Sequence, residues 1–139
     1  MKAMINEVKF NSQICTTKEQ SQRLLDLGLN PETADMVYTD ANLPYKKDEF
    51  QLICKEYSQL HKEVNYEISP FTFIPAWSLH RLIEMCNKTQ SWMIISIYNN
   101  EVTVDGALFD VFDNTYDNLI SAIECLIKEG YFNKEYLKQ

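Results

Sequence analysis

The sequence is poor in glycine, proline and histidine, and these shortages exclude several kinds of site. Its 3 glycines are isolated from one another, so they cannot form the glycine-rich loop that binds phosphate groups. Its 2 histidines, His61 and His80, have no second histidine or cysteine at the spacing of a zinc site. A length of 139 residues fits a single domain over residues 1–139. Because there are only 3 Gly and 4 Pro, we expect this domain to be ordered almost throughout.

Long apolar runs are also missing. No run approaches the ~20 residues that a membrane-spanning helix needs, and the opening "MKAMINEVKF" has no apolar segment of the kind found in signal peptides. The four cysteines lie far apart, as expected of free thiols in a reducing compartment: Cys15, Cys54, Cys86 and Cys125. We therefore expect a soluble, unprocessed cytoplasmic protein that does not bind membranes.

Positive charge is absent from one long stretch of the chain. The net charge is -7, and no Lys or Arg occurs between Lys88 and Lys128. Because contacts to phosphates need basic side chains, direct binding to nucleic acid is not expected. Five acidic residues in this stretch are predicted to form one acidic face: Glu101, Asp105, Asp110, Asp113 and Asp117.

Local signals predict a helical hairpin over residues 15–38. Thr17 and Gln20 form a capping box that starts the first helix, and Gly28 can take the left-handed conformation that ends it. Asn30 and Pro31 then supply a helix cap and a first helical residue, which predict a second helix to about residue 38.

Two further helices are predicted in the middle of the chain. Apolar residues three and four positions apart predict a helix over residues 46–64. A helix over residues 78–86 begins at its N-cap, Ser78. The segment "YEISPFTFIPAW" between them contains two prolines, so it is predicted to be extended and able to pair briefly as an edge strand.

The last third of the chain carries strand signals and a final helix. Asn99-Asn100 separates two runs of β-branched and aromatic residues and is typical of a tight type I′ turn. With a second turn at Asp105-Gly106, residues 91–112 are predicted to form an antiparallel hairpin or, preferably, a three-stranded meander. A helix over residues 115–130 is predicted to cover it, which gives an α+β fold with the helical hairpin and helices first.

Aromatic residues gather around the predicted sheet and its flanks: Trp77, Trp92, Tyr98, Phe109, Phe112 and Tyr116. Packing in a core is the favoured interpretation, and an apolar patch that binds a partner is the alternative.

The hairpin "CTTKEQSQRLLDLGLNPETADM" resembles the first two helices of a ubiquitin-associated domain. In that family the loop between the helices exposes apolar atoms to a partner, so the resemblance implies a partner-binding role for Leu27, Gly28 and Leu29. The alternative, which we favour, is that this loop packs against the rest of the protein.

Metal binding and catalysis have weaker signals. "DNTYDNLISAIE" places acids at several positions of a calcium-binding loop, but Asn118 stands where the loop needs glycine, so helix capping is the better interpretation. A nucleophilic cysteine, Cys86 or Cys125, paired with one of the two histidines has no local support. No metal and no cofactor is therefore expected.

Three segments together resemble a family of small uncharacterised proteins from gut Bacteroidetes, often found among prophage and mobile-element genes: the hairpin above, "IPAWSLHRLIEM" and "YDNLISAIECLIKEGY". The resemblance implies an accessory protein of a phage or mobile element and transfers no site residue. Our leading hypothesis is a non-enzymatic protein that binds another protein, with self-association left open. The alternatives are an acidic mimic of DNA that inhibits a basic nucleic-acid-binding protein and, third, a small Cys/His hydrolase.

Overall fold

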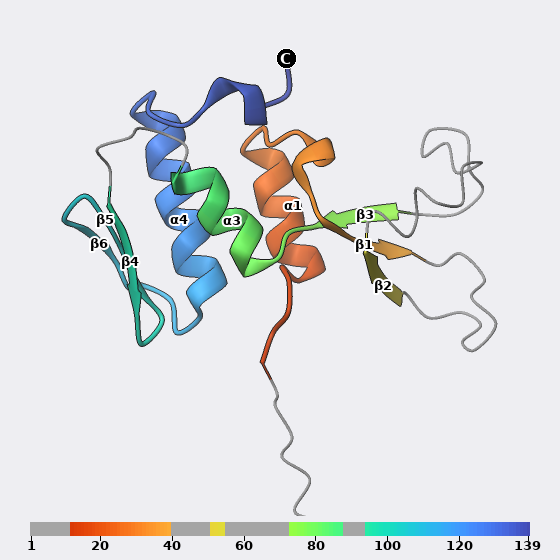
Figure 1. Ribbon diagram of the computed structural model, residues 1–139, viewed down its shortest axis with the longest axis horizontal. Coiled ribbons are helices and arrows are strands. Elements are labelled where there is room, and N and C mark those ends of the chain that lie inside the picture. The colour runs from red at the N-terminus through yellow and green to blue at the C-terminus, as the bar shows by residue number, and fades with distance from the viewer. Residues whose placement is uncertain (1–11, 40–50, 55–72, 88–93) are drawn as a thin grey trace, which may run out of the picture.

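The computed structural model describes residues 12–39, 51–54, 73–87 and 94–139. Its elements in chain order are α1 (Lys18–Asp26), the 3-10 turn η1 (Pro31–Thr33), β1 (Met36–Thr39), β2 (Gln51–Cys54), β3 (Phe73–Ala76), α3 (Leu79–Asn87), β4 (Ile95–Tyr98), β5 (Glu101–Val104), β6 (Ala107–Phe109), α4 (Thr115–Lys128) and η2 (Lys134–Tyr136). Helices α1, α3 and α4 lie between the antiparallel sheets β2-β1-β3 and β4-β5-β6 (Figure 1). The predicted α+β fold is confirmed.

The capping signals define the helix ends. The Thr17 side chain accepts a hydrogen bond from the Gln20 amide, and the Gln20 side chain accepts one from the Thr17 amide, so the capping box forms at the start of α1. After α1, Gly28 has a φ of +99°, which only glycine adopts without strain. The Ser78 hydroxyl accepts from the Arg81 amide at 3.2 Å and caps α3.

The three-stranded meander also forms as predicted. Asn99 and Asn100 have φ values of 46° and 68°, and Asp105 and Gly106 have values of 48° and 85°. Both turns therefore contain the two consecutive positive φ angles of a type I′ turn, whose twist matches that of the strands. The central strand β5 pairs with β4 on one edge and β6 on the other.

The second helix of the predicted hairpin is wrong. Asn30 does cap a turn at Pro31, but this turn is a single 3-10 turn that ends at Ala34. Residues Met36–Thr39 then form β1, the central strand of the first sheet, with Val37 and Thr39 buried. Pairing with strands on both edges satisfies the backbone of β1, whereas a short isolated helix would be marginal.

The helix predicted over residues 46–64 is contradicted where the structure describes it, because Gln51–Cys54 forms β2 and pairs with β1. The remainder of that prediction lies outside the described residues, as do residues 91–93 of the predicted meander. The apolar spacing of three and four does not reveal a strand whose partner lies elsewhere in the chain.

The prediction of an edge strand with proline is confirmed. β3 lies at one edge of its sheet and contains Pro75, which stands opposite Val37 of β1. Because proline has no amide hydrogen, it weakens the outer edge of β3 as a site for further strands.

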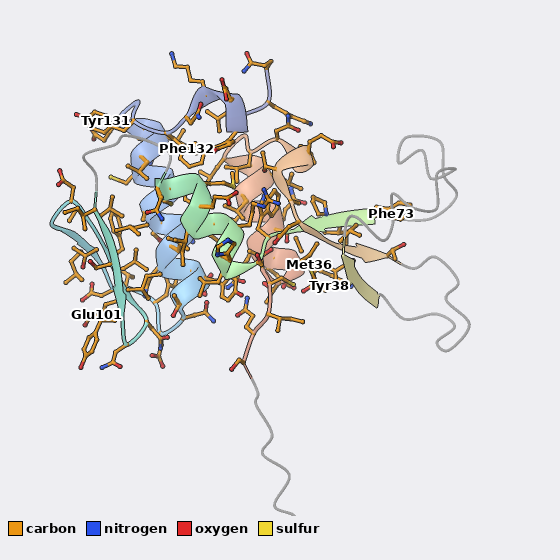
Figure 2. The ribbon with its side chains drawn as sticks, in the orientation of Figure 1. Met36, Tyr38, Phe73, Glu101, Tyr131 and Phe132 are labelled. Atoms are coloured by element: carbon orange, nitrogen blue, oxygen red, sulfur yellow. The ribbon has the colours of Figure 1, made fainter. Side chains whose placement is uncertain are left out.

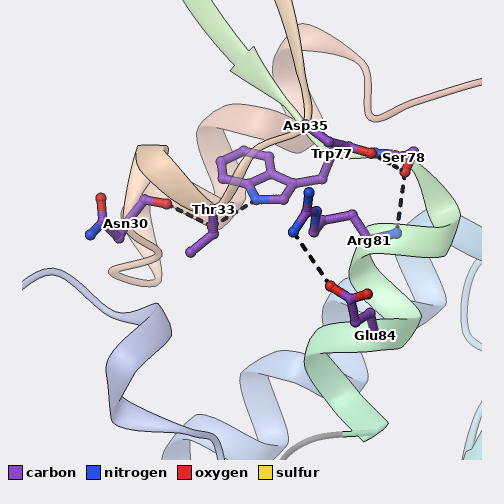
Figure 3. Close-up of polar contacts among 7 residues, drawn as sticks. All are labelled: Asn30, Thr33, Asp35, Trp77, Ser78, Arg81 and Glu84. Atoms are coloured by element: carbon purple, nitrogen blue, oxygen red, sulfur yellow. Dashed lines mark hydrogen bonds and ion pairs between the residues drawn. The ribbon is translucent and has the colours of Figure 1, made fainter. Parts of the chain in front are cut away.

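Trp77 connects the first sheet to the helices. Its side chain is fully buried, and its indole N–H donates to the Thr33 hydroxyl at 2.9 Å. Next to it, the Asp35 carboxylate accepts hydrogen bonds from the amide and hydroxyl of Ser78 at the start of α3 (Figure 3). The sequence predicts Asp35 inside the second helix of the hairpin. In the structure it lies before β1 and holds the N-cap residue of α3 in place.

Asn118 of α4 holds the second sheet in place. Its side chain is 1% exposed, and its amide group donates to the carbonyl oxygens of Asn100 at 2.6 Å and Phe112 at 2.8 Å. Its carbonyl oxygen accepts from the Phe112 amide at 3.0 Å. One buried side chain therefore links the β4–β5 turn and the segment after β6 to α4.

An Asn118→Asp substitution is expected to lower the free energy of unfolding by at least about 1–3 kcal/mol, because two carbonyl groups lose their donor and face a carboxylate instead. Asn133→Asp is the matched control, since the Asn133 side chain only accepts, from the Glu135 amide at 2.9 Å. Urea denaturation followed by circular dichroism measures both variants. Equal stability of the two would contradict the role assigned to Asn118.

Candidate protein-binding surface

The sheet β4-β5-β6 has one face on the core and one face directed away from it. Val102 and Val104 of β5 lie in the core cluster with α4, and the alternation of strand side chains places their neighbours on the opposite face. We call this opposite face the outer sheet face; its residues are Ile94, Ser96, Tyr98, Glu101, Thr103, Asp105, Leu108 and Asp110.

Large apolar side chains on the outer sheet face are strongly exposed. Tyr98 is 72% exposed, Ile94 is 70% exposed and Leu108 is 54% exposed. Just after β6, Val111 is 86% exposed. Apolar side chains gathered on one side of a small sheet are typical of a surface that binds a partner.

Carboxylates lie among these apolar side chains. Figure 2 shows Glu101 at one end of the sheet, on the other side of α4 from Met36 and Tyr38 of β1. Glu101 follows the β4–β5 turn, and the register that pairs Val102 with Phe109 places Asp110 beside it. Like charges at neighbouring positions on adjacent strands are unfavourable unless a cation lies near them.

The five predicted acidic residues do not form one cluster. Asp113 and Asp117 lie at the start of α4, which is held to the β4–β5 turn by a 2.7 Å bond from Thr115 to Asn100. They therefore share an end of the sheet with Glu101, whereas Asp105 lies in the turn at the other end of β5. Within the described ranges, no ion pair involves any of the five carboxylates.

Glu124, which lies in the same base-free stretch, differs from these five. Its carboxylate pairs with Lys128 at 3.3 Å and with Arg23 at 3.2 Å. Hydrogen bonds from Lys128 and then Arg23 lower the pKa of Glu124. Its charge is thus neutralised within the protein, and it does not contribute to the surface that a partner would meet.

The structure shows what covers the loop Leu27-Gly28-Leu29. Leu29 is fully buried and forms a β-bridge with Leu137, and the Gly28 carbonyl oxygen accepts from the Lys138 amide at 2.8 Å. Leu27 is half-buried and packs against the core. The loop expected from the resemblance to bind a partner is thus occupied by the end of the same chain, and Leu29 does not reach the surface.

The predicted aromatic cluster divides into core and surface. Trp77 and Tyr116 are buried, Phe109 is partly buried against the core, and Tyr98 is exposed. Phe112 is 43% exposed, with the Arg23 guanidinium 5.5 Å from the centre of its ring; Trp92 lies outside the described residues. Ile94 and Leu108 are not among the predicted site residues, although the alternation of side chains along the predicted strands places them beside Tyr98.

Thiol chemistry has little support in the structure. Cys86 is buried, and this burial raises the pKa of its thiol to about 12, which keeps it protonated at neutral pH. Burial also raises the pKa of Cys15, whose sulfur lies 3.3 Å from the Tyr38 hydroxyl. His80 is exposed on α3, Cys125 of α4 is partly buried, and His61 lies outside the described residues.

The described ranges contain neither a metal-binding group nor a membrane-spanning helix. No group of three or more His, Cys, Asp or Glu side chains there is placed to hold a metal ion. None of the helices in the same ranges combines the length and the apolar character needed to cross a membrane.

Comparison with known proteins adds no assignment to this geometry. The chain matches no protein-family model, no curated protein and no solved structure.

Proposed function

We propose that the protein binds another protein through the outer sheet face, and that the partner presents Lys or Arg side chains next to apolar ones. The observation that carries this proposal is the placement of Ile94, Tyr98 and Leu108, all more than half exposed, among carboxylates that form no ion pair with the described part of the chain. The apolar side chains of such a partner would bury Ile94, Tyr98 and Leu108, and its basic side chains would neutralise the carboxylates.

The mixture of side chains favours this function over an acidic mimic of DNA. A basic DNA-binding groove is complementary to closely spaced negative charges. On the outer sheet face, by contrast, the apolar side chain of Tyr98 lies opposite Glu101, and Ile94 lies opposite Asp105. The apolar side chains would contribute binding energy only to a partner with apolar groups of its own.

The test uses purified protein, immobilised and exposed to a cell lysate, with captured proteins identified by mass spectrometry. A variant with Glu101→Gln, Asp105→Asn and Asp110→Asn removes three charges, and asparagine tolerates the positive φ of position 105 as aspartate does. The matched control removes three exposed charges elsewhere, by Asp26→Asn, Glu129→Gln and Glu135→Gln.

We expect a protein captured by the wild type and by the control to be lost with the outer-face variant and with a Tyr98→Ser, Leu108→Ser variant. Raising the salt from about 50 to about 300 mM should weaken the capture, because the charges are exposed. Capture of the same proteins by all four forms would contradict the proposal. Loss with the charge variant alone, with the serine variant still active, would favour the DNA mimic.

A further inference from the structure

The two edges of the second sheet differ in what they offer another strand. Asn99 and Asn100 form a two-residue turn, so Tyr98 and Glu101 beside it are a hydrogen-bonded pair. The same pairing recurs at Ile94, whose carbonyl oxygen accepts from the Asp105 amide at 2.9 Å. In antiparallel sheets these pairs alternate with pairs that exchange no hydrogen bonds.

It follows that Ile95 and Ile97 direct their amide and carbonyl groups away from β5. Both residues stand opposite β5 residues, Val104 and Val102, at positions without hydrogen bonds. Within the described ranges, no strand pairs with this outer edge of β4. The outer edge of β4 thus has four backbone groups able to pair, the amide and carbonyl groups of Ile95 and Ile97. The outer edge of the shorter strand β6 has only two, the amide and carbonyl groups of Leu108.

The usual protections of a sheet edge are missing from β4. Its sequence, Ile-Ser-Ile-Tyr, has no proline, no charged residue and no glycine. The edge strand β3 of the other sheet, in contrast, has Pro75. An uncharged edge rich in β-branched residues is the kind to which an extended peptide adds as a further strand.

The charges define what such a strand would carry. On the outer sheet face, Ile94 and Tyr98 lie four residues apart, and each has a carboxylate opposite it: Asp105, in the turn that follows β5, and Glu101 of β5. A strand added to β4 would lie about 10 Å from β5, within reach of a lysine or arginine side chain that extends across β4. Its basic residues would therefore be at positions i and i+4.

We propose that an extended segment of the partner, with Lys or Arg at positions i and i+4 and β-branched residues between them, adds to the outer edge of β4 as a fourth strand. This inference rests on the proposed function and specifies how the partner binds. The positive charges of the segment lie over Glu101 and Asp105, and its backbone pairs with Ile95 and Ile97.

The probe is the synthetic peptide acetyl-Thr-Lys-Val-Thr-Val-Lys-Thr-amide, titrated into the full-length ¹⁵N-labelled protein and followed by NMR. A second peptide has both valines N-methylated, which removes the amide hydrogens that would pair with β4 and leaves the charges unchanged. A third has glutamate in place of both lysines. We expect the N-methylated peptide to bind at least about tenfold more weakly than the first and the glutamate peptide not to bind.

Protein variants locate the edge. Ile97→Pro removes an amide hydrogen that faces away from β5 and should weaken binding of the first peptide by about tenfold or more. Ile97→Ala, which loses the side chain and keeps the amide, should bind like the wild type, and circular dichroism checks that each variant folds.

Hydrogen exchange gives an independent measurement. The amides of Ile95 and Ile97 should exchange more slowly when the lysine peptide is bound, and that of Leu108 should not change. Equal binding of the N-methylated peptide, or protection of Leu108 alone, would overturn strand addition at β4 while the proposed function stands. Failure of the lysine peptide to bind, or equal binding of the lysine and glutamate peptides, would overturn the added strand with its two basic residues, whereas the proposed function is tested separately by the capture experiment.

Discussion

Replacement of Trp77 by alanine is expected to lower the free energy of unfolding by about 3–5 kcal/mol, because a fully buried indole leaves a large cavity. The side chain also donates to the Thr33 hydroxyl, and its backbone exchanges two hydrogen bonds with Thr16, at 2.8 and 3.0 Å. The cavity would thus open where the segment before α1, the η1 turn and the start of α3 meet. Guanidinium denaturation followed by circular dichroism measures the loss without depending on tryptophan fluorescence.

Two control variants separate the contributions to this loss. Tyr98→Ala removes an exposed aromatic side chain, and its effect should stay within about 0.5 kcal/mol. Trp77→Phe keeps part of the volume but loses the bond to Thr33, so its stability should lie between those of the wild type and Trp77→Ala. If Trp77→Ala were no more harmful than Tyr98→Ala, the core described above would be wrong.

Leu29→Ala is expected to lower the free energy of unfolding by about 2–5 kcal/mol, because the side chain is fully buried in the core. The same position joins the loop after α1 to the end of the chain through its bridge with Leu137. Leu27→Ala, which truncates a neighbour that is only half-buried, should cost less than half as much. Thermal and denaturant unfolding of both variants provides the comparison.

The two leucine variants also decide between the roles considered for this loop. If Leu29 bound a partner as in ubiquitin-associated domains, alanine there would weaken capture of that partner and leave stability almost unchanged. If the loop instead packs in the core, alanine at position 29 would lower the stability and leave partner capture by the folded protein unchanged. A stable Leu29→Ala protein would contradict the packing seen in the structure.

The binding proposals concern a different part of the molecule from these stability predictions. Trp77 and Leu29 lie in the core, whereas Tyr98, Glu101 and the edge of β4 lie at the surface. Variants of the outer sheet face are therefore expected to keep the fold, so that a change in binding can be attributed to the surface.

Local chemistry made several elements predictable. The capping box at Thr17, the N-cap Ser78 and the turn Asn99-Asn100 each act through hydrogen bonds or φ preferences within a few residues. The structure has α1, α3 and the meander where these signals place them. The stretch without Lys or Arg, which contains the meander, was likewise visible in the sequence, because charge is a property of composition.

The first sheet, in contrast, was determined by contacts between distant segments. Residues 36–38 and 51–54 were predicted to be helical, but 36–39 and 51–54 are strands because they pair with each other, and residues 73–76 complete the sheet. A strand is stabilised mostly by side-chain pairs and hydrogen bonds with the adjacent strands, so the sequence of a four-residue strand predicts it only weakly.

The candidate surface shows the same division. The sequence by itself determined that Glu101, Asp105 and Tyr98 lie on or next to a hairpin and that no Lys or Arg occurs between Lys88 and Lys128. Only the tertiary structure decided that Leu29 is covered by the end of the chain and that Ile94 and Leu108 are exposed. Turns and charges are properties of neighbouring residues, whereas exposure depends on which segments pack together, and that depends on the whole folded chain.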